Sequence, residues 1–581
     1  MIMKKMMKQI LALVLSVFIL MSCAACGETN TPGSSADASE YLNTDGSLPI
    51  VKEGYEKTLK VAIRMYSDSG EPDSQWFYQF VKNEMNINLE VQKVSGSEQI
   101  SLLLVDGDLP DIIIGGGFGT ADLMSSGANE GLFADLAPYI TETGTPNLYK
   151  LFNENPEYRE AVSDRDGHIW SLGYINDTRD RGQISRAFIN YEWLEDAGLE
   201  TPATLDEFVD MLRAFKKRGD NIIPMSGSWE NNNPFLILLN AFGYLTEDPQ
   251  GMGIALRNGE PVLPVADREV YGEYLKLMHT LYEEGLIDPN FFTTDATTSR
   301  AIIAAGRTGY IPNAPFTYMT SYTDWWGAQP LTSEYNSTRQ WPAGNAAMTC
   351  GGFVVSAESE NIELAMAFAD WFFDPTGANY NMSVNGPAAS QTDYIYGENA
   401  NVNGFKINEE TFAVSYPDYE NNTSGYSSKN DYLGKEVYLW GYRILGLGKG
   451  NVSSNLEAVQ YGYTADQIID NYPDVSDPAI QGDLRKQTEG DGEMHFRSAL
   501  EDTMVPYVVE GFPGKVYLDA ETSTMMANIM MIIREYATQE TAKFITGRKS
   551  FDELDNYFDE IERLGAKQVL ETYKTYYEST K

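Results

Sequence analysis

Residues 57–65 read KTLKVAIRM and residues 87–94 read INLEVQKV, and these two stretches decide the fold class. Apolar and polar side chains alternate in both, as they do in β-strands, whereas residues 76–85 between them have the apolar spacing of a helix. The aliphatic run 112–114 (III) follows between turn residues, which is typical of a parallel strand buried on both faces. The sequence therefore predicts a β-α-β opening and an α/β fold.

The rest of the chain continues this mixture of helices and strands. Thr204 and Glu207 form the pattern of a capping box, and apolar side chains recur on one face after it, so a helix is predicted over 204–217. A second helix, over 270–284, is predicted to end at Gly285. Further predicted elements are strands over 165–172, 188–190 and 351–356 and helices over 361–373, 523–541 and 550–577. The Met-rich run within 525–531 has helical spacing and predicts core filling.

The N-terminus has the pattern of a secretory signal peptide over residues 1–22. Lys4, Lys5 and Lys8 precede the uncharged apolar run 10–21, and small residues and cysteine follow. That run is shorter than the roughly 20 apolar residues of a membrane span, and no other stretch approaches this length. We therefore expect export, with no spanning helix in the mature chain.

Cys23 and Cys26 are both candidates for the cysteine of a lipobox, where the new N-terminus is acylated. Cys23 has an aliphatic residue at minus three and a small residue at minus one, whereas Cys26 has Ala24-Ala25 before it and Gly27 after it. We favour Cys23, with Cys26 as the alternative. A disulfide between them would tie together a segment with no fold to stabilise. Residues 23–50 are thus predicted to be a lipid anchor and a flexible tether rich in Ser, Thr, Gly, Asn and Ala.

The length of the chain predicts how many lobes it has, and its net charge argues against some classes of partner. The remaining chain is too long for one ordinary core, so two or more lobes are expected. The formal net charge of −42 argues against nucleic acid and anionic lipid as partners, because both require a positive surface. The only contact with the membrane is then through the N-terminal lipid.

Several segments resemble family 1 extracellular solute-binding proteins, in particular the LipO-like lipoproteins of Gram-positive bacteria. The matching stretches occur in the order of that family and are spread along the mature chain: 103–112 (LLVDGDLPDI), 131–136 (GLFADL), 166–172 (DGHIWSL), 189–215, 351–373 and 544–577. The resemblance implies a carbohydrate receptor, with an oligosaccharide as the expected ligand, that serves the permease subunits of an ABC importer. It would be a monomer held on the extracellular face of the cell membrane.

The same resemblance implies a two-lobe fold of the maltodextrin-binding-protein type, with ligand in the cleft between the lobes and closure by hinge motion. By this analogy the first lobe comprises residues 51–182 and a return segment over 350–395. The second lobe comprises 183–349 and 396–581, including the C-terminal helices. The sequence departs from many longer relatives at 216–224 (KKRGDNIIP), where a calcium loop would need more oxygen ligands than Asp220 and Asn221 provide. We predict no metal there.

Candidate ligand-binding residues are chosen for the chemistry of sugars. Sugar rings offer apolar faces and a rim of hydroxyls, so a sugar site pairs flat aromatic side chains with carboxylate, amide and Arg groups on polar loops. For each tryptophan the alternative is packing in the core. The candidates are Asp73, Trp76, Trp229, Glu230, Asn233, Asp324, Trp325, Trp326, Trp440 and Arg443.

Catalytic chemistry has less support in the sequence. His168, His279 and His495 are the only histidines, and none has a partner at metal-ligand or nucleophile spacing. No phosphate-binding motif or cofactor motif occurs, so no cofactor is expected. A glycosidase needs only two carboxylates, and with 84 acidic residues it stays the alternative from the enzyme class. A surface adhesin that binds glycans without transport is the third possibility.

Overall fold

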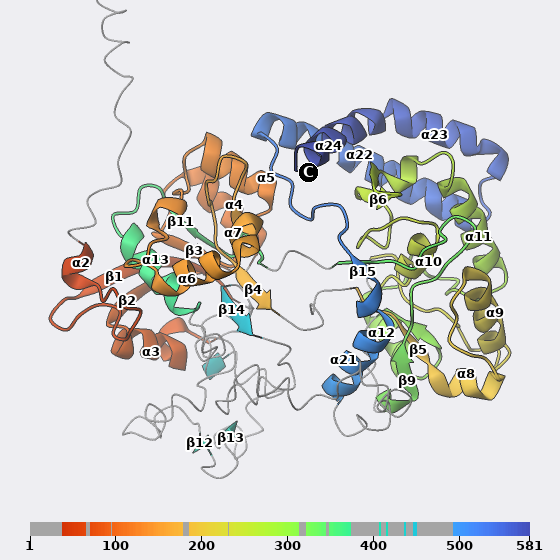
Figure 1. Cartoon of the computed structure of the whole chain (residues 1–581), viewed down its shortest axis with the longest axis horizontal. Coiled ribbons are helices and arrows are strands. Elements are labelled where there is room, and N and C mark those ends of the chain that lie inside the picture. Colours follow the sequence, from red (N-terminus) through yellow and green to blue (C-terminus); the bar gives the residue numbers. More distant parts are fainter. Residues whose placement is uncertain are drawn as a thin grey trace, which may run out of the picture.

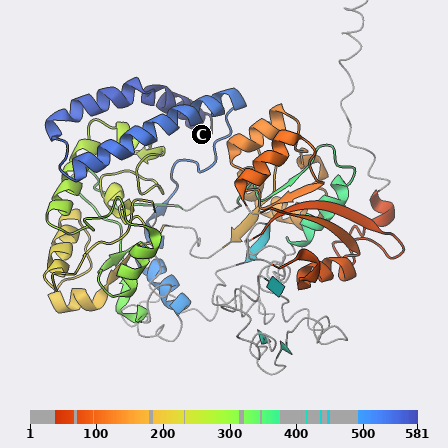
Figure 2. The ribbon, with the colours of Figure 1, turned by 180° about the vertical axis from the view of Figure 1, so that it is seen from behind.

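The chain folds into two lobes, and the segment between β15 (Val508–Val509) and α22 (Ala520–Ile545) crosses from one to the other (Figures 1 and 2). This computed structural model describes residues 38–65, 70–94, 96–177, 185–230, 232–312, 321–343, 348–373 and 492–580, with the short pieces 406–407, 414–415, 435–436 and 445–449. Buried side chains form separate clusters in the two lobes. The expected division into two cores is therefore seen directly.

The first lobe is built on a four-stranded sheet of order β11-β3-β1-β2. Strand β1 (Lys57–Arg64) pairs in parallel with β2 (Ile87–Val94) and β3 (Ile112–Ile114), whereas β11 (Phe353–Val355) runs antiparallel to β3. Helix α3 (Trp76–Glu84) connects β1 to β2, as the β-α-β pattern predicted.

Alternation along β1 places its side chains in two different cores. Val61 and Ile63 belong to the larger cluster, while Ala62 belongs to the smaller cluster on the other face of the sheet. Both faces are covered here, which explains why β3 and residues 61–63 of β1 are apolar and buried. The larger face packs on α3, α6 (Pro146–Glu154) and α13 (Ile362–Trp371).

The remaining elements of the first lobe lie around this sheet. They are α2 (Ala38–Tyr41), η1 (Pro72–Ser74), α4 (Ser97–Asp106), α5 (Thr120–Leu123), η2 (Met124–Asn129), η3 (Ala137–Tyr139), α7 (Pro156–Val162), β4 (Tyr174–Asp177) and β14 (Gly446–Lys449).

The predicted strand over 165–172 is wrong. The Asp-Gly turn is present, with Gly167 at φ 87°, but after it only Leu172 pairs, through a single bridge to Phe353. The backbone first bonds to the return segment at Leu172, and strand β4 begins two residues later, at Tyr174. Alternating side chains here reflect partial burial against the lobe and not a strand ladder.

The second lobe is mainly helical around a small sheet of order β8-β5-β9. Strand β5 (Phe188–Asn190) pairs antiparallel with β8 (Tyr310–Ile311) and β9 (Trp325–Gly327). Its other elements before the C-terminal part are α8 (Tyr191–Ala197), α9 (Leu205–Lys216), α10 (Leu236–Ala241), β6 (Ala255–Arg257), β7 (Glu260–Val262), η4 (Pro264–Ala266), α11 (Tyr271–Glu283), α12 (Ala296–Ala304), η6 (Tyr322–Asp324) and β10 (Trp341–Pro342).

The predicted helix signals in this lobe are confirmed. Thr204 caps α9 by accepting from the backbone N–H of Glu207 at 3.3 Å, and the Glu207 carboxylate accepts from the N–H of Thr204 at 3.0 Å. The backbone N–H groups of Ala203 and Thr204 both donate to the Glu207 carboxylate and lower its pKa. Helix α11 ends before Gly285, which has φ 66°.

The C-terminal part adds a layer of helices to the second lobe and reaches back to the first (Figure 1). It comprises α21 (Gly492–Thr503), η10 (Val505–Tyr507), β15 (Val508–Val509), α22 (Ala520–Ile545), η11 (Phe551–Glu553), α23 (Leu554–Arg563) and α24 (Ala566–Thr580). Helix α22 contacts α5 and η2 of the first lobe near its beginning and α11 of the second lobe further on. A single helix therefore bridges the two lobes.

Strand β14 bears on the predicted lobe boundaries. It pairs in parallel with β4, and Leu445 beside it packs in the larger core of the first lobe. The first lobe thus includes a segment beyond 350–395, while the predicted boundary at 395/396 itself lies outside the described residues.

Candidate functional site: an interlobe cavity

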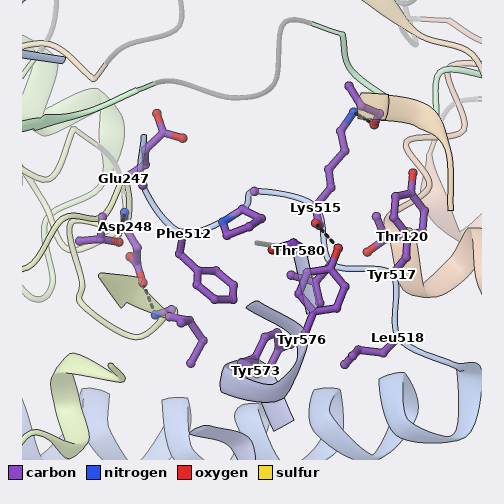
Figure 3. A pocket seen from close by; sticks show the side chains of 18 of the residues that line it. Thr120, Glu247, Asp248, Phe512, Lys515, Tyr517, Leu518, Tyr573, Tyr576 and Thr580 are labelled. Atoms are coloured by element: carbon purple, nitrogen blue, oxygen red, sulfur yellow. Dashed lines mark hydrogen bonds between the residues drawn. The ribbon is translucent and has the colours of Figure 1, made fainter. Parts of the chain in front are cut away.

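A cavity of about 1370 Å³ lies between the two lobes. Figure 3 shows it from close by. The first lobe contributes residues of α5 and α7, including Thr120 and Glu157, and the second lobe contributes the loop that contains Glu247 and Asp248. Because both lobes line it, any relative movement of the lobes must change its shape.

A chain crossing over 510–518, here called the interlobe strap, forms one wall of the cavity. It follows β15, which pairs with β10, and it leads directly into α22. Gly511, Pro513 and Gly514 keep it free of regular structure. Its ends are fixed by secondary structure, so the middle is held by side chains.

Lys515 anchors the strap to the first lobe. Its ammonium donates to the carbonyls of Ala161, at 2.7 Å, and Met348. Burial lowers the pKa of Lys515, and the thiol of Cys350 opposes this by a hydrogen bond. The carbonyl of Lys515 in turn accepts from the Tyr576 hydroxyl at 3.2 Å. One strap residue thus ties α7, the return segment and α24 together.

Aromatic side chains from the strap and α24 meet at the cavity. The Phe512 ring lies 5.9 Å from Tyr573 and 5.6 Å from Tyr577, measured between centroids. Phe512 and Tyr573 are partly exposed, and Figure 3 shows them side by side. Partly exposed rings are the surfaces that an apolar sugar face can cover.

The loop of the second lobe carries two acidic residues with different environments. Asp248 accepts from the backbone N–H groups of Gln250, Met252 and Gly253 at 2.7–2.9 Å, so its carboxylate shapes the loop. Glu247 is partly buried, and burial raises its pKa to about 7. Glu247 therefore carries its proton about half of the time near neutral pH.

Of the two predicted residues of the first lobe, Trp76 lies in the core and Asp73 lies at the surface. Trp76 is only 4% exposed, and its ring packs 5.3 Å from Phe80. Asp73 in η1 is exposed, and its carbonyl accepts from the Gln79 side chain at 2.6 Å. Burial favours the alternative of core packing for Trp76, while a role in binding stays a prediction.

Trp229 is also buried, although its polar loop lies close to the cavity. The ring packs at 5.4 Å from Phe292, and the Trp229 carbonyl accepts from Asn233 and Gln250 side chains at 3.2 and 3.0 Å. Asn233 is buried as well, and only Glu230 is exposed. The Asn233 side chain thus bonds to the backbone of its own loop, donating to the Trp229 carbonyl and accepting from the Phe235 N–H.

Trp325 and Trp326 form strand β9 and are 2% and 5% exposed. The Trp326 indole donates to Asp502 at 2.8 Å, and the Trp325 carbonyl bonds to the His495 ring at 2.8 Å. Asp324, which ends η6, is partly buried. These contacts dock α21 on the sheet of the second lobe, so the predicted polar loop is a strand with a helix packed against it.

Four predicted positions fall outside the described residues: Trp440, Arg443, Cys23 and Cys26. Their roles in ligand binding and lipidation remain predictions.

The prediction that the Met-rich run fills the core is only partly correct. Met526 and Met530 are buried, but Met525 is 40% exposed and Met531 is 63% exposed. Met530 and Met531 both line the cavity, because α22 borders it along one side. The helical period predicted the helix, but which face would meet a cavity depends on the position of the other lobe.

Sequence reasoning missed Glu247, Phe512, Lys515 and Tyr573 as candidate site residues. The Gly- and Pro-rich stretch at 511–514 was the one available signal, because it marks a break between elements at which a loop can carry functional residues.

The described part of the chain contains neither a group of metal-ligating side chains nor a membrane-spanning helix. Within it, no three His, Cys, Asp or Glu side chains are grouped to hold a metal ion. At 216–224, the Lys216 ammonium donates to the Ile222 carbonyl at 2.9 Å. Among the helices of this part, none has the length and apolar character that crossing a membrane requires.

Two known proteins are similar to this chain in sequence. The chain is 24% identical over 575 residues to the fructooligosaccharide ABC transporter substrate-binding protein FusA of Streptococcus pneumoniae, covering 96% of this chain and 95% of that protein. It is 23% identical over 322 residues to the lipoprotein LipO of Bacillus subtilis, covering 53% and 56% of the two chains.

Solved structures show the same fold. An HMO-binding, ABC-transporter-associated solute-binding protein of Bifidobacterium longum infantis superposes with a TM-score of 0.66 at 18% identity, covering 90% of this chain and 99% of that one. FusA in complex with kestose gives 0.62 at 22% identity, with the same coverage. The predicted two-lobe α/β fold is thereby confirmed. Residues 67–379 of the 581 match the family model for bacterial extracellular solute-binding proteins, and the chain belongs to that family, as the resemblance predicted.

Proposed function

We propose that this protein is the solute-capturing component of an ABC importer and that it binds an oligosaccharide in the interlobe cavity. The observation that carries the proposal is that one large cavity is lined by both lobes and by the strap that joins them. A ligand bound there touches both lobes at once. It can therefore favour one arrangement of the lobes over another, which is how a permease would distinguish loaded from empty receptor.

The size and lining of the cavity support a sugar larger than one ring. Its volume of about 1370 Å³ exceeds the roughly 300–1,000 Å³ of pockets that hold drug-sized ligands. Phe512 and Tyr573 offer partly exposed ring faces, and Glu247 and Arg534 offer polar groups for hydroxyls. A fructooligosaccharide receptor among the relatives is consistent with this choice of ligand.

Isothermal titration calorimetry against neutral oligosaccharides of increasing length tests the proposal. We expect binding, and we expect Phe512→Ala to weaken it by about tenfold through loss of a stacking surface worth about 0.5–1.5 kcal/mol. Tyr55→Ala is a matched control, because Tyr55 is 36% exposed on the first lobe away from the cavity. Unchanged affinity in Phe512→Ala would place the sugar elsewhere on the protein.

The relatives are binding proteins, and we propose that this protein likewise does no chemistry on its ligand. Incubation of the purified protein with its bound oligosaccharide should return the sugar intact. Shorter products would instead support the glycosidase alternative.

We further propose that the mature protein is anchored on the extracellular face of the membrane through a lipid on Cys23, and that it delivers its ligand there to the permease subunits. The motivation is the signal peptide and lipobox pattern, together with a relative that is a lipoprotein. Cys23→Ser should release the protein from the membrane or leave it unprocessed, whereas Cys26→Ser should not. The reverse pattern would assign the lipid to Cys26.

A further inference from the structure

The formal charges that line the interlobe cavity are unbalanced. Five acidic side chains and two basic side chains contribute to the lining. The acidic residues are Glu157, Glu160, Glu247, Asp248 and Glu510, and the basic residues are Lys515 and Arg534. The balance matters because a site for an anionic ligand needs cations that are free to pair with it.

Lys515 is not available for this purpose. A lysine ammonium has three donors. Two of them go to the carbonyls of Ala161 and Met348, and the thiol of Cys350 is a third partner. Pairing Lys515 with a ligand would detach the strap from the first lobe. In the described part of the chain, Arg534, exposed on α22, is then the one remaining cation that lines the cavity.

The inner acids are not readily available to a cationic ligand either. The Asp248 carboxylate already accepts from three backbone N–H groups. Glu247 is partly buried in an environment that favours its uncharged form. The solvent-exposed carboxylates among the described lining residues are those of Glu157, Glu160 and Glu510, here called the rim. Among these residues the inner acids offer no free carboxylate for a cationic ligand, while the rim repels an anionic one.

Building on the proposed function, we propose that the ligand is an uncharged oligosaccharide and that the cavity excludes uronic-acid oligosaccharides. The rim carboxylates of Glu157, Glu160 and Glu510 repel a ligand that carries a carboxylate on every ring. The described lining residues include the cation Arg534 and two part-exposed aromatic rings, Phe512 and Tyr573, and these suit hydroxyl groups and apolar sugar faces.

Calorimetry with three sets of oligosaccharides of equal length tests this proposal: neutral oligosaccharides, oligogalacturonides and glucosamine oligomers. We expect the neutral set to bind at least tenfold more tightly than either charged set. The electrostatic screening length falls from about 30 Å at about 0.01 M salt to about 3 Å at about 1 M salt. The difference in affinity between neutral oligosaccharides and oligogalacturonides should therefore be smaller at the higher salt concentration.

A pair of charge variants isolates the rim. Glu157→Gln with Glu160→Gln should raise the ratio of the affinity for oligogalacturonides to the affinity for neutral oligosaccharides at least threefold. Glu53→Gln with Glu56→Gln is the matched control, because both carboxylates are exposed on the first lobe and do not line the cavity. It removes the same charge from the protein and should change neither affinity.

The outcomes separate the two proposals. Oligogalacturonides or glucosamine oligomers that bind as tightly as neutral sugars would overturn the inference about ligand charge, while the proposed oligosaccharide receptor would stand. Equal effects of the rim and control variants would overturn the assigned role of the rim. If no oligosaccharide of any charge binds, the proposed function fails and the inference fails with it.

Discussion

At the scale of single residues, the tryptophans show how a side chain can be polar in sequence context and buried in space. Trp229 and Trp326 stand among polar neighbours, yet both lie in the core of the second lobe. The Asn233 side chain donates to the Trp229 carbonyl, and Asp502 on helix α21 accepts from the Trp326 indole. A polar neighbour therefore indicates a polar partner, which need not be a ligand.

Truncating either tryptophan should cost stability before it costs binding. We expect Trp229→Ala and Trp326→Ala to lower the free energy of unfolding by about 3–5 kcal/mol, because each leaves a cavity in a packed core. Urea unfolding measures the change. Phe512→Ala, at a partly exposed ring, should change stability much less, and a tryptophan variant that weakens sugar binding without loss of stability would instead favour a stacking role.

Glu247 should make stability depend on pH. Burial raises its pKa to about 7 from the ordinary value of 4.5, so the folded state binds this proton more tightly than the unfolded state. The free energy of unfolding should therefore fall as pH rises from about 4.5 to about 7. The Glu247→Gln variant has no carboxyl to titrate at this position, so its free energy of unfolding should not fall in this way. At pH 8 it should exceed that of the parent by on the order of 1–3 kcal/mol. Thermal melts from pH 4 to 8 measure it, with Glu510→Gln, an exposed carboxylate at the same cavity, as the control that should keep the slope of the parent.

At the scale of elements, the strap and helix α22 connect the lobes in different ways. The strap is irregular and is held by side chains, chiefly those of Lys515 and Tyr517, whereas α22 is a continuous helix from Ala520 to Ile545. The helix can transmit a movement as a rigid body, and the strap can absorb one through backbone rotation. Hinge motion then depends on how firmly the strap is docked.

Lys515→Met should loosen the strap. The variant keeps the apolar stem but leaves the carbonyls of Ala161 and Met348 without their donor, which costs about 1–3 kcal/mol for a buried unsatisfied group. Hydrogen exchange of the backbone over 510–518 should become faster, while exchange in β1 and β3 stays slow. Lys515→Arg, which retains the charge and the donors, is the matched control. If exchange over the strap is unchanged in Lys515→Met, the backbone pairing of β15 and not Lys515 holds this segment.

At the scale of the whole molecule, the arrangement of two cores around one cavity predicts that ligand binding changes the shape of the protein. A ligand that touches both lobes favours the arrangement in which both sets of contacts form. Small-angle scattering should show a smaller radius of gyration at saturating oligosaccharide. At a concentration one hundred times the Kd, the free energy of unfolding should rise by about 2.7 kcal/mol. A sugar that does not bind in calorimetry is the control, and scattering that is unchanged at saturation would contradict closure.

The sequence by itself determined the elements and the class of fold. Alternation in 57–64 and 87–94, the capping box at Thr204 and the terminating Gly285 each act through neighbours within a few residues, so they can be read without the rest of the chain. The matching segments likewise identified the family. The tertiary structure alone decided which faces meet across the lobes: it buried Trp76, Trp229, Trp325 and Trp326, and it brought Glu247, Phe512, Lys515 and Tyr573 to one cavity. These last residues are separated by more than 300 positions at the extremes, and no local pattern encodes a contact that forms only when two separately folded cores are held side by side.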